Sequence, residues 1–383
     1  MQSSSKAIIW VVVVLVILVG GYYLYRGSAP VETGPIKIGV LQPLTGDAAS
    51  YGESEYKAIQ IAAEEINKTG GINGRQIELI AEDSKCDPQA GGTAAQKLVN
   101  VDGVKVIIGG ACSGETLAAA KITEPAKVIL LSPSASSPKV SEAGDFVFRT
   151  YPSDALAGRI NARYAYEKLG ARKAAVFTEL TDYAQGLREV YKTSFQEFGG
   201  EIVADETYNT GDVDFRTQVL KIKSKNPDII YVVPQSPTPG VAIFKQLREA
   251  GVKAQFTTAE VLLDRQVVKD NAKALEGVIG VEVAVDYDNN PKANSLRTAH
   301  RAKFNSDPGS FAANAYDAVY LIRDAILEKG LNTGKIRDWL YSVKNWMGSV
   351  GAITIDKNGD PVMGENVRKI SGGAVSDLGS YAP

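Results

Sequence analysis

Two spacings of apolar residues alternate along most of this 383-residue chain. Short, largely apolar runs such as Ile36–Leu41, Val104–Ile108 and Asp228–Val233 predict strands that are covered on both faces. The stretch Gly52–Lys68 instead carries apolar residues at helical spacing, which predicts an amphipathic helix. Repeated units of a strand and a helix predict parallel sheets with helices on both faces.

These units fall into two series, which predict an α/β chain of two doubly wound lobes. The other expected strands are Gln76–Asp83, Val128–Leu131, Phe146–Phe148, Ala174–Phe177, Glu201–Ala204, Gln255–Thr258 and Gly277–Val283. The other expected helices begin at Asp87 and Gln185 or span Phe215–Ser224, Gly240–Ala250, Pro291–Ser306 and Phe311–Lys329. The last two must pack back onto one of the lobes, and Asn358-Gly359 is expected in a hairpin turn.

The beginning of the chain has a different composition. No charged residue stands between Lys6 and Arg26, and as a helix Ala7–Tyr25 would span roughly 28 Å, about one hydrocarbon core. We therefore expect residues 1–35 to be a retained membrane anchor with a short linker. A cleaved signal peptide is the alternative, although Pro30 spoils its best cleavage site. Either way the remainder is expected outside the cytoplasm.

Composition and charge exclude several classes of function. The formal net charge of -2 gives no reason to expect a nucleic-acid partner. The only histidine, His300, stands in a charged helical stretch and is expected to be solvated. Histidine-rich metal sites and Ser-His-Asp catalysis both need an imidazole beside other reactive groups. The sequence therefore argues against both. Since no other pair of nucleophile and base is visible, we expect no enzyme, no metal and no cofactor.

The sequence contains two cysteines, Cys86 and Cys112. They follow two strands that are expected to be neighbours, and export would place them in an oxidising compartment. A bridge between them would stabilise the fold by about 3.5 kcal/mol in the chain-entropy model. Two free buried thiols are the alternative.

Ser113 stands where an anion could bind. A buried strand ends at the pair Gly109-Gly110, and Ser113 occupies the expected N-cap position of the helix that follows. Free N–H groups and the positive end of a helix dipole meet there, at the carboxyl edge of the sheet. The alternative is that Ser113 only caps its helix.

Several motifs follow one another in a recognisable order. They are Ile36–Gly46, Tyr51-Gly52, Glu64–Gly74, Asp83–Gln89, Gly109–Gly114, Ser132–Ser136 and Asp228–Tyr231. In these motifs the chain resembles the type I periplasmic solute-binding proteins, specifically the leucine/isoleucine/valine receptors of ABC importers. The resemblance implies two Rossmann-like lobes joined by a three-crossover hinge, and a Cys86–Cys112 disulfide. It divides the chain into 36–153 with 284–360, and 154–283 with 361–383.

The resemblance also implies a set of ligand contacts. They are Tyr51, Ser113, Ser134, Ala135, Ser136, Tyr183, Glu260 and Phe311. Ser113 and the 134–136 turn would receive an α-carboxylate, and Glu260 of the other lobe would receive an α-ammonium. Such a division suits a zwitterion, because an unpaired buried charge is costly. Ala111 and Gln235 depart from the family, which commonly has a bulkier aliphatic and an aromatic residue there.

The function expected from this resemblance is a monomeric, non-enzymatic receptor. It would capture an amino acid, branched-chain or otherwise small and apolar, and deliver it to the membrane subunits of an ABC importer. Hinge closure would follow from ligand contacts to both lobes. A ligand-sensing receptor, or binding of a short amide or urea-like solute, is the alternative.

Overall fold

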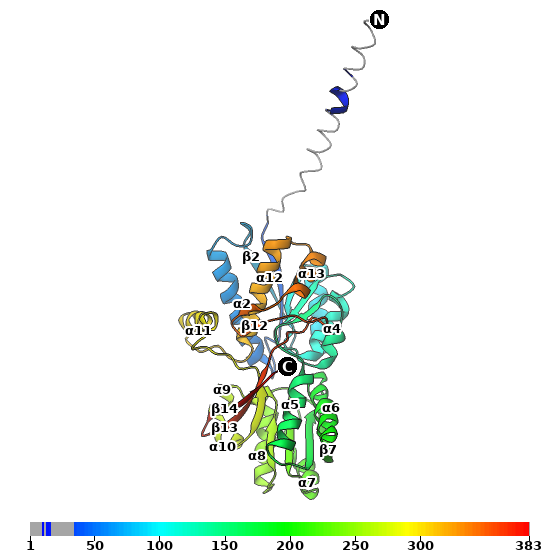
Figure 1. Cartoon of the computed structure of the whole chain (residues 1–383), viewed down its shortest axis with the longest axis vertical. Helices are drawn as coiled ribbons and strands as arrows, with labels where there is room; N and C mark the ends of the chain where they lie inside the picture. Colours follow the sequence, from blue (N-terminus) through cyan, green and yellow to red (C-terminus); the bar gives the residue numbers. More distant parts are fainter. Residues whose placement is uncertain (1–9, 11–12, 17–33, 383) are drawn as a thin grey trace. The chain divides into compact units, whose positions relative to one another are not determined.

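The structure, a computed structural model, describes residue 10, residues 13–16 and residues 34–382 (Figure 1). Residues from Ile36 onward form one compact unit. Most of the expected membrane span, Ala7–Tyr25, lies outside the described residues, so it stays a prediction. In the part of the chain that is described, no helix combines the length and apolar character needed to cross a membrane.

The first lobe is built on a parallel sheet with the strand order β2-β1-β3-β4-β5. Its strands are β1 (Ile36–Gln42), β2 (Ile77–Asp83), β3 (Val106–Gly109), β4 (Ile129–Ser132) and β5 (Val147–Arg149). β3 and β4 are buried along their whole length, as unbroken apolar runs predict for a parallel sheet covered on both faces. The expected strands of this series are confirmed to within two residues at each end.

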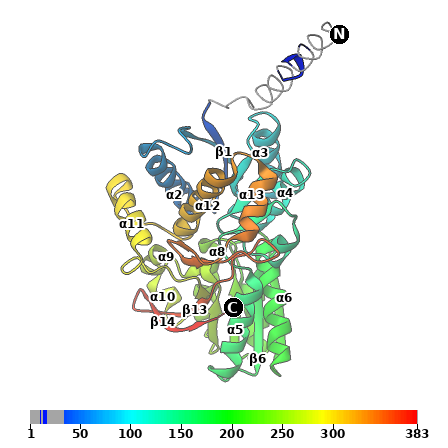
Figure 2. The same ribbon diagram turned by 45° about the horizontal axis from the view of Figure 1, so that its top comes forward.

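Helices from both ends of the compact unit belong to this lobe. They are α2 (Ala49–Lys68), α3 (Pro88–Asn100), α4 (Ser113–Thr123), the 3-10 helix η1 (Pro138–Glu142), α11 (Pro291–Phe304), α12 (Ala312–Lys329) and α13 (Thr333–Ser342). A short hairpin of β11 (Trp346–Gly348) and β12 (Gly351–Ile353) follows them. Because α11 and α12 contact α2, the late helices return to the first lobe (Figure 2).

The second lobe is built on a sheet with the strand order β14-β13-β10-β9-β8-β6-β7. Its parallel strands are β6 (Lys173–Glu179), β7 (Glu201–Tyr208), β8 (Ile229–Val233), β9 (Gln255–Thr258) and β10 (Ile279–Glu282). All five overlap expected strands. Two further strands, β13 (Glu365–Ser371) and β14 (Ala374–Tyr381), extend the sheet in antiparallel fashion and were not predicted.

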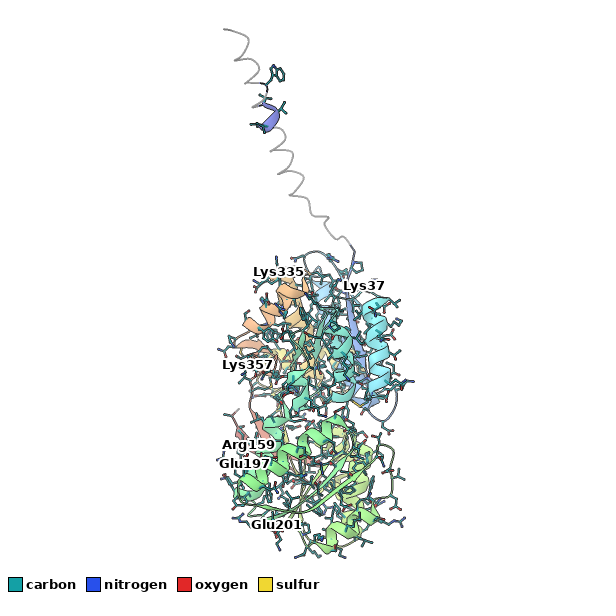
Figure 3. The ribbon with its side chains drawn as sticks, turned by 90° about the vertical axis from the view of Figure 1, so that its right-hand side faces the viewer. Lys37, Arg159, Glu197, Glu201, Lys335 and Lys357 are labelled. Atoms are coloured by element: carbon teal, nitrogen blue, oxygen red, sulfur yellow. A yellow bond between two sulfur atoms is a disulfide. The ribbon has the colours of Figure 1, made fainter. Side chains whose placement is uncertain are left out.

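The helices of the second lobe are α5 (Asp154–Glu167), α6 (Asp182–Glu197), α7 (Arg216–Ser224), α8 (Pro237–Glu249), the 3-10 helix η2 (Glu260–Leu262), α9 (Arg265–Asp270) and α10 (Ala272–Leu275). An ion pair of 2.9 Å between Arg159 and Glu197 joins the exposed surfaces of α5 and α6 (Figure 3). Surface pairs of this kind contribute little stability, so buried apolar side chains hold the lobe together.

The chain passes between the two lobes after β5, after β10 and between β12 and β13. These three passages form the expected crossovers. The expected lobe boundaries after residues 153, 283 and 360 fall in the connecting segments, and the placing of each boundary stays a prediction.

His300 corrects one expectation, because it is only 2% exposed rather than solvated. Its Nδ1 lies 2.7 Å from the carbonyl oxygen of Ser306. Asn305 ends α11 in a left-handed conformation (φ 54), so the chain turns back and the loop after the helix covers the imidazole. The burial lowers the pKa of His300. The charged sequence neighbours of His300 gave no sign of this turn.

Candidate ligand-binding site

A cavity of about 20 Å³ lies where the two lobes face each other. Its walls come mainly from residues that follow the carboxyl ends of β3, β4, β6, β8 and β9, the place where open parallel sheets bind ligands. The lining consists of Tyr51, Ala111, Cys112, Ser113, Ser134 and Phe311 from the first lobe, and Tyr183, Gln235, Glu260 and Val261 from the second.

Six of the eight predicted ligand contacts line this cavity. The other two, Ala135 and Ser136, are buried in the same turn as Ser134. Cys112 and Val261 were not predicted, although each directly adjoins a predicted residue, which was the available signal. The structure thus brings the predicted residues together, and their roles stay proposals.

A second, larger cavity of about 650 Å³ is bordered by Glu260 and Phe311 as well. It is lined by charged side chains of both signs, including Asp264, Arg265 and Arg368. The smaller cavity is the better candidate, because it alone gathers the start of α4 and the turn after β4.

The disulfide shapes the first wall of the candidate site. Cys86 and Cys112 are bridged, with 5.4 Å between their Cα atoms, which confirms the pairing. Cys112, in an extended conformation, takes the N-cap position of α4, and its N–H donates to Glu115 Oε1 at 3.0 Å. The expectation that Ser113 is the N-cap is therefore wrong by one residue. Cys112 takes the cap position in place of Ser113, since the bridge to Cys86 holds Cys112 just outside the helix.

Ser113 is consequently free to hold the neighbouring turn. Its Oγ accepts a hydrogen bond from the N–H of Ser137 at 3.1 Å. In the same turn Ser136 Oγ is buried and makes no hydrogen bond of good geometry with the described residues, although the Asp154 carboxylate lies near it. The first N–H groups of α4 also lack intrahelical acceptors. This side of the cavity therefore offers hydrogen-bond donors to an anion.

The opposite side of the cavity carries negative charge. Glu260 is 6% exposed, and its Oε1 accepts a hydrogen bond from Tyr183 Oη at 2.9 Å. Burial raises the pKa of Glu260 to about 7, while the Tyr183 hydrogen bond acts in the opposite direction. Burial also raises the pKa of Asp154 and of Glu365 well above the usual carboxyl value, and the charge of Glu260 adds to both. Sequence reasoning missed Glu365 because its strand was not predicted.

Contacts across the cavity show that the lobes are closed on each other. Tyr51 Oη donates to the carbonyl oxygen of Val261 in the second lobe at 3.3 Å. Within the first lobe, the Tyr51 ring meets that of Phe311 edge-on at 5.9 Å. At the rim, Lys139 of η1 pairs with Asp182 of α6 at 2.9 Å. Aromatic and aliphatic side chains thus enclose the polar ends of the cavity.

Gln235 borders the cavity from the loop between β8 and α8. Its backbone N–H donates to Glu179 Oε2 at 2.8 Å, and its side-chain amide makes no hydrogen bond to the described part of the chain. The hydrogen bond to Glu179 therefore fixes the backbone of Gln235, while its side-chain amide stays available to a ligand. The amide makes the wall more polar, and the small Ala111 makes it less bulky, than the resemblance alone implies.

A sequence profile of the periplasmic binding protein family matches residues 35–374. The chain belongs to this family. Its members are solute-binding proteins of ABC transporters rather than enzymes, and the family location is extracytoplasmic. The resemblance seen in the sequence, including the two-lobed fold, is thereby confirmed.

Individual relatives agree with this assignment. A leucine-, isoleucine-, valine-, threonine- and alanine-binding protein of Pseudomonas aeruginosa is 32% identical over 297 residues, 77% of this chain and 79% of the relative. The leucine-binding protein LivK of Thermotoga maritima has a TM-score of 0.85 at 29% identity, covering 91% of this chain and 99% of that chain. LivJ of Streptococcus pneumoniae, solved with isoleucine, has a TM-score of 0.82 at 31% identity, with the same coverage.

Proposed function

We propose that this protein binds an α-amino acid between its lobes and delivers it to the membrane subunits of an ABC importer. The observation that carries the proposal is the opposition of two chemistries across one small cavity. Hydrogen-bond donors lie on the first lobe, at Ser113 in the cavity wall and at Ser136 in the adjacent turn, and the buried carboxylate of Glu260 lies on the second.

A zwitterion fits this arrangement better than a neutral or singly charged solute does. Its carboxylate would bind the donors at the start of α4 and in the turn after β4. Its ammonium would pair with Glu260, which is otherwise buried and makes no ion pair with the described residues. Tyr51, Tyr183 and Phe311 would then enclose the side chain. Relatives whose names give leucine, isoleucine, valine, threonine and alanine as ligands support this class.

The same arrangement provides a mechanism of closure. The carboxylate contacts lie on one lobe and the ammonium contact lies on the other, so only the closed form satisfies both charges. A ligand that binds the closed form more tightly shifts the equilibrium between open and closed protein toward the closed form. The contact between Tyr51 and Val261 supports this, since it joins the lobes directly over the cavity.

Gln235 favours one variation of this function. A free amide in the wall can bind a hydroxyl or amide group, so the ligand side chain need not be wholly apolar. A short amide or urea-like solute remains the alternative ligand class, and ligand sensing remains the alternative role. The genes beside this one would separate transport from sensing.

We further propose that the protein acts as a monomer held at the outer face of the membrane by residues 7–25. The uncharged length of that segment supports the anchor. Sequencing the amino terminus of the protein purified from its own cells tests it. A mature terminus near Pro30 would mean that the segment is a cleaved signal peptide.

The proposed ligand class is tested by thermal-shift screening of the purified compact unit against amino acids, short amides and urea, followed by calorimetry. We expect stabilisation by at least one α-amino acid. Binding of amides or urea with no response to any amino acid would refute the proposal in favour of the alternative ligand class.

A further inference from the structure

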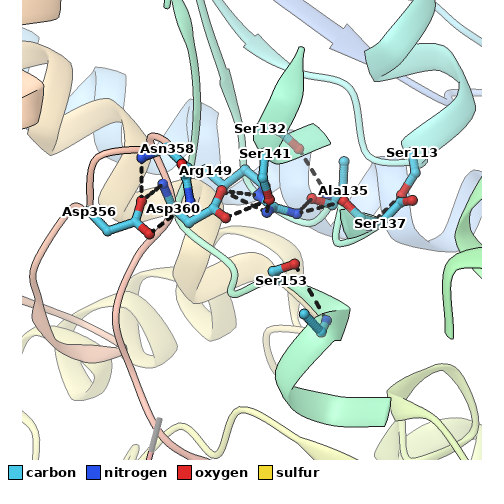
Figure 4. A network of polar contacts seen from close by, with 11 residues as sticks. Ser113, Ser132, Ala135, Ser137, Ser141, Arg149, Ser153, Asp356, Asn358 and Asp360 are labelled. Atoms are coloured by element: carbon cyan, nitrogen blue, oxygen red, sulfur yellow. Dashed lines mark hydrogen bonds and ion pairs between the residues drawn. The ribbon is translucent and has the colours of Figure 1, made fainter. Parts of the chain in front are cut away.

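Next to the Ser113 side of the candidate site, a buried arginine has an acceptor for each of its side-chain N–H groups. Arg149, the last residue of β5, is 1% exposed. Its Nη1 donates to the carbonyl oxygens of Ala135 and Ser137 at 3.2 and 3.1 Å, and its Nη2 donates to Ser141 Oγ at 2.7 Å (Figure 4). Its Nε and Nη2 reach Asp360 Oδ1 at 2.8 and 2.6 Å.

These contacts use all the hydrogen-bonding capacity of the side chain. A guanidinium carries five N–H donors in a fixed fork, and each has an acceptor here. A buried cation that lacked acceptors would be costly, so the site is built for arginine. Lysine has three donors at a single point and cannot reach the same acceptors.

The turn that Arg149 holds is the one that offers donors to the ligand. Arg149 takes the carbonyls of Ala135 and Ser137, and the N–H of Asp154 donates to the carbonyl of Ser136 at 2.8 Å. The carbonyl oxygens of residues 135–137 are thus all occupied. The N–H and Oγ of Ser136, by contrast, have no hydrogen-bond partner of good geometry among the described residues. Arg149 thus fixes which side of the turn remains free.

The same contacts tie the turn to the crossovers between the lobes. Arg149 directly precedes the first crossover, and Asp360 directly precedes the segment that leads to β13. Asp360 is itself held in the expected turn around Asn358, because Asp356 Oδ1 accepts the N–H groups of both residues at 2.8 and 3.0 Å. A change of hinge geometry would therefore be transmitted through Arg149 and Asp360 to the 134–137 turn.

We propose that Arg149 is a positioning residue, which shapes the 134–137 turn for a ligand carboxylate and links that turn to the first and third crossovers. The inference rests on the proposed function in that the ligand carries a carboxylate. Arg149 does not line the cavity, so it acts only through the turn.

The test compares isoleucine with isoleucinamide, which keeps the side chain and the ammonium but lacks the carboxylate. In Arg149→Lys we expect affinity for isoleucine to fall about tenfold, as for one lost hydrogen bond to a charged group, with little change for isoleucinamide. The matched control is Arg188→Lys, which disturbs an Arg–Asp205 pair on α6 and β7, away from the cavity. It should change neither affinity.

A purely structural role would lower both affinities together and leave their ratio unchanged, which would overturn the inference. Should Arg149→Lys fail to fold, Asp360→Asn keeps one acceptor oxygen for Arg149, removes the charge and replaces the oxygen that accepts from Ser141 Oγ at 2.7 Å. The ratio of its affinities for isoleucine and isoleucinamide should fall by a smaller factor. An unchanged ratio in that variant would overturn the inference as well. Failure of the unaltered protein to bind any amino acid would instead refute the proposed function.

Discussion

Replacement of Glu260 by glutamine is the most direct perturbation of the candidate site. The change removes the negative charge while keeping the size of the side chain and an acceptor for the Tyr183 hydroxyl. If Glu260 pairs with a ligand ammonium, the variant must bind that cation in a closed cavity without a counter-charge. We expect a large loss of affinity and weaker closure of the lobes.

The magnitude depends on pH. With a pKa of about 7 in the ligand-free protein, Glu260 is roughly nine-tenths ionised at pH 8 and one-tenth ionised at pH 6. At pH 8 the lost pair should cost about 3–5 kcal/mol, a rise in Kd of about 150- to 5,000-fold. At pH 6 the unaltered protein must first release the proton, which weakens its own binding about tenfold relative to pH 8. The glutamine variant has no such proton to release.

Calorimetry with the best-binding amino acid at pH 6 and pH 8 measures both effects, and small-angle scattering reports closure. Glu249→Gln is the control, since Glu249 is exposed on α8, and it should bind like the unaltered protein. Ser113→Ala should lose less, about 1.5–3 kcal/mol, although it also releases Ser137. Unchanged affinity in Glu260→Gln, or a pH dependence equal to that of the unaltered protein, would refute the ammonium role of Glu260.

Three other predictions follow from the structure. Burial raises the pKa of Glu55 to about 8, so the folded state holds this proton more tightly than the unfolded chain does. Protonated Glu55 therefore adds its full contribution to the free energy of unfolding below about pH 4.5, and this contribution is lost as pH rises through 8. The melting temperature of the ligand-free protein should fall from pH 5.5 to 8.5, and a fall of the same size in Glu55→Gln would contradict this. Replacing Cys86 and Cys112 by serine should cost about 3.5 kcal/mol in chemical denaturation, and an unchanged midpoint would exclude this contribution. Gln235→Leu should raise affinity for isoleucine relative to threonine, and an unaltered ratio in competition calorimetry would show that the amide does not contact the ligand.

The parallel strands could be predicted from the sequence because strands buried on both faces need unbroken apolar runs, which are visible locally. Ile229–Val233 is buried at every position, and only an unbroken apolar run suits such a strand. Strands β13 and β14 lack such a run, since only three residues of β13 are buried and β14 is exposed or half-buried at every position. Their antiparallel pairing at the edge of the sheet supplies backbone hydrogen bonds without an apolar run, so the chain after Pro361 gave no strand signal.

The candidate site was predictable where residue type and strand position agree. Ser113 and Glu260 each follow a strand at its carboxyl end, and the resemblance gave both a role. Contacts between distant segments were not predictable in the same way. The ion pair between Arg149 and Asp360 joins residues 211 positions apart, and neither residue stands out among the charged residues of the chain. His300 was misjudged for the same reason, because a loop rather than its own helix buries it.

The buried acids of the second lobe connect these observations to the choice of ligand. Asp154, Glu260 and Glu365 come from α5, η2 and β13, and their mutual repulsion adds to the cost of burying any one of them ionised. A ligand with a carboxylate alone would add negative charge to a site that already resists it. A zwitterion, the ligand class proposed above, would bring its cation to the acids and its anion to the donors that Arg149 is proposed to position. On the proposed function, charge complementarity would favour an ammonium at the second lobe, and closure of the lobes would be the step that satisfies it.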